Sequence, residues 1–243
     1  MKKFLFILVS VLIVGYLIFA AFYFQNTQKN EICNRFEVIV QDSAQTKFVH
    51  PHEIKQLVKN KGLDPAGKTV KEINTLDIRD AILSNKLVKS AEVYATQDGS
   101  IIANISQRKP VLRVISDTEG SYYIDNNREK MPTSINFSVY VPIATGAIGE
   151  EFAKNDLFDF AEFLDEHPDW DAWIEQIVVK KDNKVELVPR AGDFRIVLGT
   201  LDNYPAKLAK FSLFVKKGLN VVGWNRYSEI NLAYDNQVVC TKK

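Results

Sequence analysis

The chain has 243 residues, of which 46% are hydrophobic and 25% charged, and this composition is typical of globular proteins and excludes a disordered or collagen-like chain. The formal net charge is +1 at pH 7, which gives no support to a nucleic-acid partner, because such proteins show a basic face or stripe. The length suggests one large domain or two small ones.

An apolar run lies at the start of the chain. Phe4–Phe24 holds 21 residues without a charge, and a helix of that length spans about 31 Å, close to the hydrocarbon thickness of a bilayer. A cleaved signal peptide is the alternative, but its apolar core is about 7–15 residues long and leads to small residues, whereas residues 20–24 end in bulky side chains. We therefore expect a transmembrane helix in the lipid bilayer. Lys2 and Lys3 precede it, so residues 1–3 form the expected cytoplasmic tail.

The rest of the chain is expected outside the cytoplasm, as in a single-pass type II protein of the inner membrane with a periplasmic C-terminal region. A juxtamembrane linker covers residues 25–34. Beyond residue 24 there are 29 basic and 30 acidic side chains, a net charge of −1, which again argues against nucleic acid. Cys33 and Cys240 are the two cysteines. An oxidising compartment permits a disulfide, and the sequence leaves a bridge and two separate thiols open.

Residues 35–108 predict the element order β-α-α-β-β. Runs of β-branched and alternating apolar residues predict strands at Phe36–Val40, Ala91–Ala95 and Ile101–Ile105, with Asp98-Gly99 as a hairpin turn. The first helix is predicted by Pro51 near its start, by the apolar stripe of Ile54, Leu57 and Val58, and by Gly62 at its end. The second helix is predicted to start at Asn74, with Asp77 three residues later.

This order, just outside a single membrane helix, resembles a polypeptide-transport-associated (POTRA) domain. The segment that follows makes the chain similar to the bacterial cell-division family FtsQ/DivIB. In that family a Glu-Arg-x-Pro-like boundary is followed by a strand that ends in Asp-x-x-Gly. Here Gln107, Arg108 and Pro110 form the boundary, and Asp125 ends the strand.

Two positions depart from the family pattern. Gln107 stands where the family usually has Glu, and Arg128 stands where it usually has Gly. Neither change removes a catalytic group, because the family has none. Glycine suits a positive φ and arginine does not, so we expect Asn126 or Asn127 to take that conformation instead.

Residues 109–243 resemble the β domain of the same family. The expected fold class is α+β: a transmembrane helix, a POTRA domain over residues 35–108, and a mixed α+β domain with an extended, antiparallel-rich sheet. The predicted strands of this last domain are Val111–Ile115, Tyr122–Asp125, Ile174–Val179, Lys184–Val188, Phe194–Leu198 and Ile230–Val239, and its predicted helices are Phe152–Phe163 and Tyr204–Lys217.

No sequence motif for a nucleophile, a nucleotide or a metal centre occurs, so we expect no catalytic residue, no cofactor and no metal. His50 and His52 are better explained as a solvent-exposed helix start than as metal ligands. The acidic segment 165–171 lacks the glycine and the distal glutamate of a calcium loop, which favours a solvated helix end. Trp170 and Trp173 suit core packing, with a carbohydrate platform as the alternative.

The C-terminal strand is the candidate partner-binding site. An edge strand exposes unpaired N–H and C=O groups to which a partner strand can add. The resemblance implies that the last strands receive an FtsB-like segment, with an FtsL-like protein joining them, and that a Tyr in a hydrophobic-x-Leu-x-Tyr pattern makes contact. Tyr234 is then the main contact candidate, and packing of its ring on the preceding helix is the alternative. The full predicted site is Ile230, Leu232, Tyr234, Asn236 and Val238.

The resemblance implies a non-enzymatic division protein. It would scaffold the divisome at the septum, contact other divisome components, and link FtsB-like and FtsL-like proteins to control of septal peptidoglycan synthesis. Two alternatives remain open: a membrane-anchored envelope protein that binds or hydrolyses glycans, and another POTRA-bearing envelope assembly factor.

Overall fold

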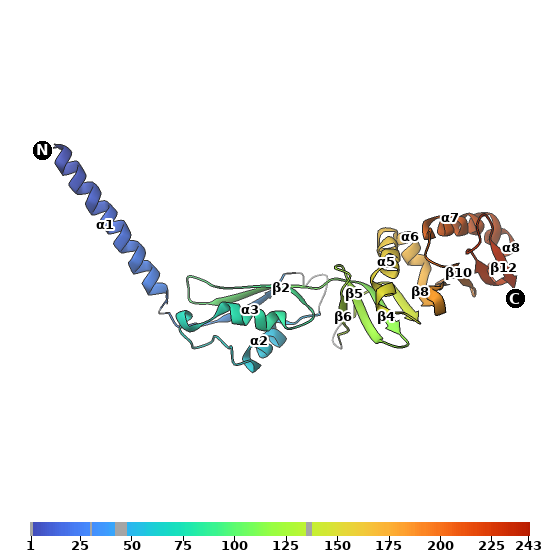
Figure 1. The fold of residues 1–243 in the computed structure, drawn as a ribbon, viewed down its shortest axis with the longest axis horizontal. Coiled ribbons are helices and arrows are strands. Elements are labelled where there is room, and N and C mark those ends of the chain that lie inside the picture. The colour runs from blue at the N-terminus through green and yellow to red at the C-terminus, as the bar shows by residue number, and fades with distance from the viewer. Residues whose placement is uncertain (1, 30, 42–47, 135–137) are drawn as a thin grey trace. The chain divides into compact units, whose positions relative to one another are not determined.

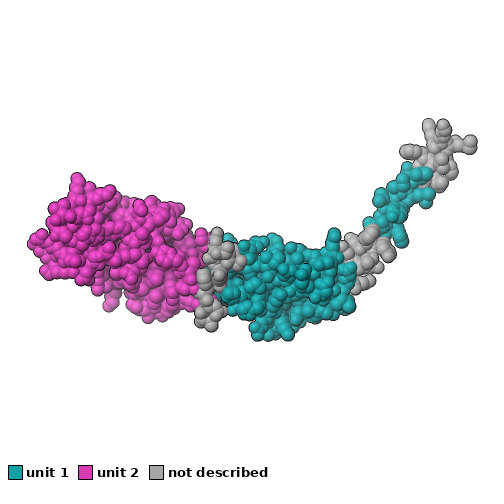
Figure 2. Space-filling model, turned by 180° about the vertical axis from the view of Figure 1, so that it is seen from behind, with its two compact units in different colours: residues 1–107 teal, residues 108–243 magenta. Residues whose placement is uncertain are grey.

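The computed structural model describes the chain except for residues 1, 30, 42–47 and 135–137, and it describes no side chains for residues 2–8 and 23–29. The described chain divides into two compact units, residues 1–107 and 108–243 (Figure 2).

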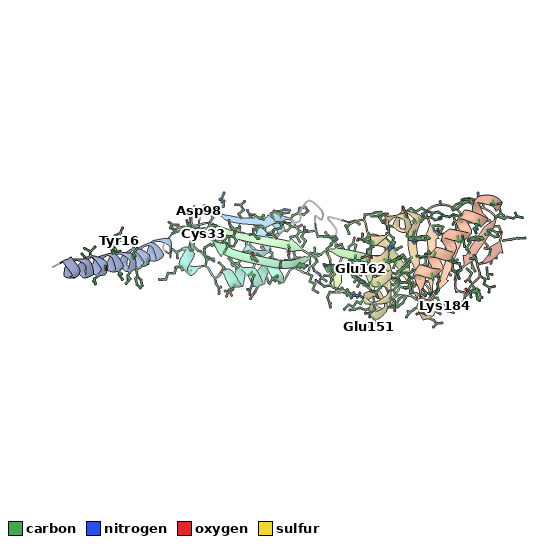
Figure 3. All side chains as sticks on the ribbon, turned by 90° about the horizontal axis from the view of Figure 1, so that it is seen from above. Tyr16, Cys33, Asp98, Glu151, Glu162 and Lys184 are labelled. Carbon is green, nitrogen blue, oxygen red and sulfur yellow. The ribbon has the colours of Figure 1, made fainter. Side chains whose placement is uncertain are left out.

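Helix α1, Lys2–Lys29, begins the first unit. Its large apolar side chains between residues 9 and 22 are exposed, among them Tyr16, which is 69% exposed and projects from the helix in Figure 3. Within the part of the chain that the structure describes, no helix combines the length and the apolar character that a membrane span requires. The structure describes no side chains for residues 4–8 and 23–24 of the expected span, or for residues 25–30 of the expected linker.

The first unit contains a three-stranded sheet with the order β1-β3-β2. β1 runs parallel to β3, and β2 runs antiparallel to it through the predicted hairpin. Figure 1 shows α2 and α3 on one side of these strands. The predicted order β-α-α-β-β is confirmed. The bounds are β1 Phe36–Val40, α2 Pro51–Asn60, α3 Thr75–Leu83, β2 Val88–Ala95 and β3 Ile101–Gln107, with a short 3-10 helix, η1, at Val70–Glu72.

Local signals explain these elements. Asn74 caps α3, because its side chain accepts hydrogen bonds from the backbone N–H groups of Leu76 and Asp77. α2 packs against β1 and α3 against β2, and one stripe of each helix and alternate residues of β3 are apolar and buried. The core includes Ile54, Val58, Ile78, Ile82, Ile101, Ala103 and Ile105, all at most 1% exposed.

The second unit is built on a nine-stranded mixed sheet with the order β12-β11-β10-β9-β8-β7-β4-β5-β6. The pairs β4–β7, β7–β8 and β10–β11 are parallel, and the others are antiparallel. The strands are β4 Pro110–Ser116, β5 Gly120–Asp125, β6 Lys130–Pro132, β7 Ile143–Gly146, β8 Ile174–Val179, β9 Val185–Pro189, β10 Arg195–Gly199, β11 Tyr227–Asn231 and β12 Val239–Lys242.

Helices cover one face of this sheet (Figure 1). Alternate strand residues such as Leu112, Ile177 and Leu187 are fully buried, and they form one core with Phe160 and Phe211 of the helices. The helical segments are α4 Glu150–Lys154, α5 Asp156–Glu166, α6 Pro168–Trp173, α7 Tyr204–Phe214 and α8 Asn220–Val222, with a 3-10 turn, η2, at Lys181–Asn183 and a π-helical turn, η3, at Val215–Leu219.

Two predicted elements of this unit are wrong in extent. The helix expected over Phe152–Phe163 is two helices, α4 and α5, because the backbone of Asn155 leaves the helical region at φ −111° and ψ −94°. The strand expected over Ile230–Val239 is two antiparallel strands, β11 and β12. Asn236 lies between them with φ 57°, a left-handed conformation that suits asparagine in a turn and breaks a strand.

Candidate functional site

The β11–β12 hairpin ends the nine-stranded sheet. β11 pairs with β10 on one side and with β12 on the other, and β12 is the last strand in the order. The outer edge of β12 therefore has no strand partner among the described residues. Its four residues, Val239–Lys242, are exposed or half-buried. Unpaired main-chain groups of this kind form a template for strand addition.

The five predicted contact residues do not share one strand face. Ile230 and Leu232 are fully buried in the core of the unit, and Val238 packs against that core. Asn236 lies in the turn, so the period-two reasoning that aligned it with Tyr234 is wrong. Tyr234 is 52% exposed in the same turn. Of the five, Tyr234 and Asn236 are exposed to a partner, and Ile230 and Leu232 hold the hairpin in position.

Several hydrogen bonds fix the first half of this turn. The N–H of Leu232 donates to the carbonyl of Val197 in β10 (2.8 Å), and the N–H of Ala233 donates to Oδ1 of Asn231 (3.0 Å). Lys210 of α7 donates from Nζ to the carbonyl oxygen of Leu232 (3.0 Å) and to that of Tyr234. Sequence reasoning missed Lys210, because a contact across 22 residues leaves no trace in periodicity.

The predicted boundary residues form a compact polar network at the start of the second unit. Arg108 Nε donates to Oδ2 of Asp125 at 2.7 Å, and its Nη2 donates to the carbonyl of Glu129 at 3.0 Å. Asp125 is 1% exposed, and its Oδ1 accepts the N–H groups of Asn127 and Glu129 (2.9 and 2.8 Å). Hydrogen bonds of this kind satisfy a buried carboxylate. The network closes the loop after β5.

Gln107 and Pro110 lie on either side of the boundary. The Gln107 side chain is buried at the end of β3, where its Oε1 accepts the N–H of Val49 at 2.8 Å. This acceptor role needs only a carbonyl oxygen, so glutamine can fill it without bringing a charge into the core. Pro110 begins β4 and lies opposite Asp125 in β5.

Arg128 itself adopts the left-handed conformation, with φ 62°. The expectation that Asn126 or Asn127 would take it is wrong. The Arg128 guanidinium lies 4.3 Å from the ring centroid of Phe158, and its Nη2 is 2.5 Å from Oδ1 of Asp159. These contacts offset a backbone cost of about 1–2 kcal/mol for a residue other than glycine.

Trp170 and Trp173 lie in an aromatic cluster. Their rings are 6.3 and 5.7 Å from that of Phe211, and Trp173 is 5.3 Å from Trp224. The side chains of Trp170 and Trp173 are both half-buried and pack against the core of the unit, as predicted. The same indoles line an open groove of about 510 Å³ between α6 and α7, together with Val215 and the polar side chains of Asp169, Ser212 and Lys216.

The cysteines and the metal-ligating residue types form neither a disulfide nor a metal site in the part of the chain that the structure describes. Cys33 is buried and Cys240 is half-buried in β12, and both are free thiols. Burial raises the pKa of the Cys240 thiol, which favours its neutral form. Among the described His, Cys, Asp and Glu residues, no three come together as a metal site.

Comparison with known families gives two matches that together cover most of the chain. A family model described as "FtsQ/DivIB, C-terminal related" matches residues 109–241. A model described as a POTRA-like domain matches residues 31–106. No curated protein matches the chain.

Proposed function

The chain belongs to the FtsQ/DivIB family, and from this membership we propose that it scaffolds the divisome at the septum and links FtsB-like and FtsL-like proteins to control of septal peptidoglycan synthesis. The family consists of non-catalytic division proteins, and its two domains here indicate a role in cell division. In this proposal the chain catalyses no reaction and works through its contacts.

The free edge of β12 carries the proposal. A partner strand can pair with its main-chain groups, while the exposed ring of Tyr234 gives the contact a side chain to recognise. Tyrosine is enriched among the residues that dominate binding energy at interfaces. The buried anchors Ile230 and Leu232 keep this edge at a fixed place at the end of the sheet.

A membrane anchor completes the proposal. The uncharged sequence Phe4–Phe24 and the exposed apolar side chains of α1 between residues 9 and 22 support a single span. With Lys2 and Lys3 at the cytoplasmic end, the two units then lie in the periplasm of a type II inner-membrane protein. Such an anchor tethers the chain to the membrane where septal wall synthesis takes place.

Tyr234→Glu tests the contact by placing a charge at the proposed interface. We expect the full chain to capture an FtsB-like division protein at least tenfold less well than the wild type, a cost of about 1.4 kcal/mol or more. Tyr140→Glu is the matched control, because Tyr140 is an exposed tyrosine of the same unit outside the hairpin. Equal capture by the wild type and both variants would place the binding site elsewhere.

Hydrogen exchange separates strand addition from a contact made by side chains alone. If a partner strand pairs with β12, amides in residues 239–242 become protected when the FtsB-like protein is added. Protection of other segments without any change in residues 239–242 would rule out strand addition at this edge.

A further inference from the structure

Lys210 connects helix α7 to the turn of the candidate site. Its ammonium donates to two carbonyls that lie two residues apart, those of Leu232 and Tyr234. Both carbonyls lie after β11 has ended, where the β11–β12 ladder no longer supplies partners. A lysine ammonium has three N–H donors, so one side chain can satisfy both acceptors at once.

Of these two hydrogen bonds, the one to Tyr234 acts on the part of the hairpin that packing leaves exposed. Ile230 and Leu232 are fully buried and hold the end of β11 whether or not Lys210 is present. After Leu232 the chain is exposed from Ala233 to Gln237. Lys210 holds the carbonyl of Tyr234 within this exposed stretch, so it sets the direction in which the chain leaves the core.

We propose that Lys210 is a positioning residue, which holds the turn so that Tyr234 and the outer edge of β12 are presented together to a partner strand. This inference rests on the proposed function. A turn fixed before binding lowers the ordering cost that association would otherwise pay. When only a fraction of molecules has the competent turn, the apparent dissociation constant rises by the inverse of that fraction.

Lys207 provides a matched control on the same helix. It lies three residues before Lys210, is also half-buried, and donates from Nζ to the carbonyl of Thr200 at 2.7 Å. That carbonyl lies outside the β11–β12 turn. Lys207→Met therefore removes an ammonium and a hydrogen bond from α7, and with them the charge that Lys207 places near Asp235, while both hydrogen bonds of Lys210 to the turn remain.

The experiment uses the full chain with Lys210→Met, Lys210→Arg and Lys207→Met. Hydrogen exchange is first measured without partner. In Lys210→Met we expect at least fivefold faster exchange in residues 233–237, with the thermal midpoint within about 2 °C of the wild type, because the core contacts remain. Lys210→Arg keeps a donor and should exchange more slowly than the Met variant, and Lys207→Met should match the wild type in this segment.

Binding to the FtsB-like protein is then measured for the same four chains. We expect about five- to tenfold weaker affinity for Lys210→Met, partial recovery in Lys210→Arg, and no change in Lys207→Met. Unchanged exchange in Lys210→Met overturns the role of Lys210 even when the wild type binds. Faster exchange with unchanged affinity also overturns it. A wild-type chain that does not bind overturns the proposed function, and this outcome is recognised independently of the exchange data.

Discussion

Tyr122 places a polar atom in the core of the second unit. The residue is 2% exposed, and its hydroxyl has no hydrogen-bond partner among the described residues. The ring packs in the core, and Nζ of Lys130 lies 4.2 Å from its centroid in a cation–π contact. Burial, with smaller contributions from the negative charges of Glu119 and Glu150, raises the pKa of Tyr122 to about 12.

Tyr122→Phe removes the hydroxyl and keeps the ring. Because a buried unpaired hydroxyl costs free energy, we expect the free energy of unfolding at pH 7 to stay equal or rise by up to about 1 kcal/mol. Above pH 10 the unfolded chain loses the Tyr122 proton before the folded chain does, so wild-type stability falls between pH 10 and 12. The variant should lose less stability over that range.

Urea unfolding at pH 7 and pH 11 measures both effects, and Tyr234→Phe gives the background from an exposed tyrosine. A Tyr122→Phe variant less stable than the wild type by more than 1 kcal/mol at pH 7 would show that the hydroxyl is satisfied.

At the scale of elements, short sequence signals predict the turns and helix caps that depend only on neighbouring residues. The Asp98-Gly99 hairpin and the Asn74 cap were predicted correctly, because a turn dipeptide and a capping side chain act on neighbouring residues. The break between β11 and β12 was missed, although Asp235-Asn236 is a recognisable turn signal within INLAYDNQVV. The alternating apolar residues on either side of this signal favour one continuous strand, which the left-handed Asn236 interrupts.

Other features lay outside the reach of sequence patterns. The parallel pairing of β4, β7 and β8 depends on packing between distant segments, so no window of sequence contains it. The left-handed Arg128 is stabilised by Phe158 and Asp159, about 30 residues further along the chain. The pattern names Tyr234 as a contact candidate, which stays a prediction, whereas the burial of Leu232 and the hydrogen bonds of Lys210 are visible only in the fold.

Helix α1 offers a test of where function resides. Under the proposed function the partner contacts lie in the second unit, so α1 supplies only the anchor. Exchanging residues 4–24 for an unrelated membrane helix of the same length and orientation should keep most division activity, measured as rescue of filamentation after depletion of the native chain. Complete loss of rescue, with the exchanged protein present at its normal level in the membrane, would show that this helix has partners of its own.

At the scale of the molecule, the chain carries two separate cores. Ile54 is buried in the first unit and Leu157 in the second, and each is fully enclosed by its own unit. Replacing either with alanine should cost about 2–5 kcal/mol within its unit. We expect each substitution to lower one thermal transition and to leave the other within about 2 °C.

Scanning calorimetry of the wild type, Ile54→Ala and Leu157→Ala checks this independence. A single transition that shifts equally in both variants would show that the two units unfold as one cooperative body.

The short length of β12 limits how long a bound partner strand stays attached. Four residues offer few outward main-chain hydrogen bonds, so a strand added there is held by a small contact and, without further anchoring, has a short residence time. A second attachment, through a shared membrane or another subunit, raises the effective concentration and lets such a contact re-form quickly after each release. Under the proposed function, the edge of β12 is suited to an assembly that is built and taken apart in every cell cycle.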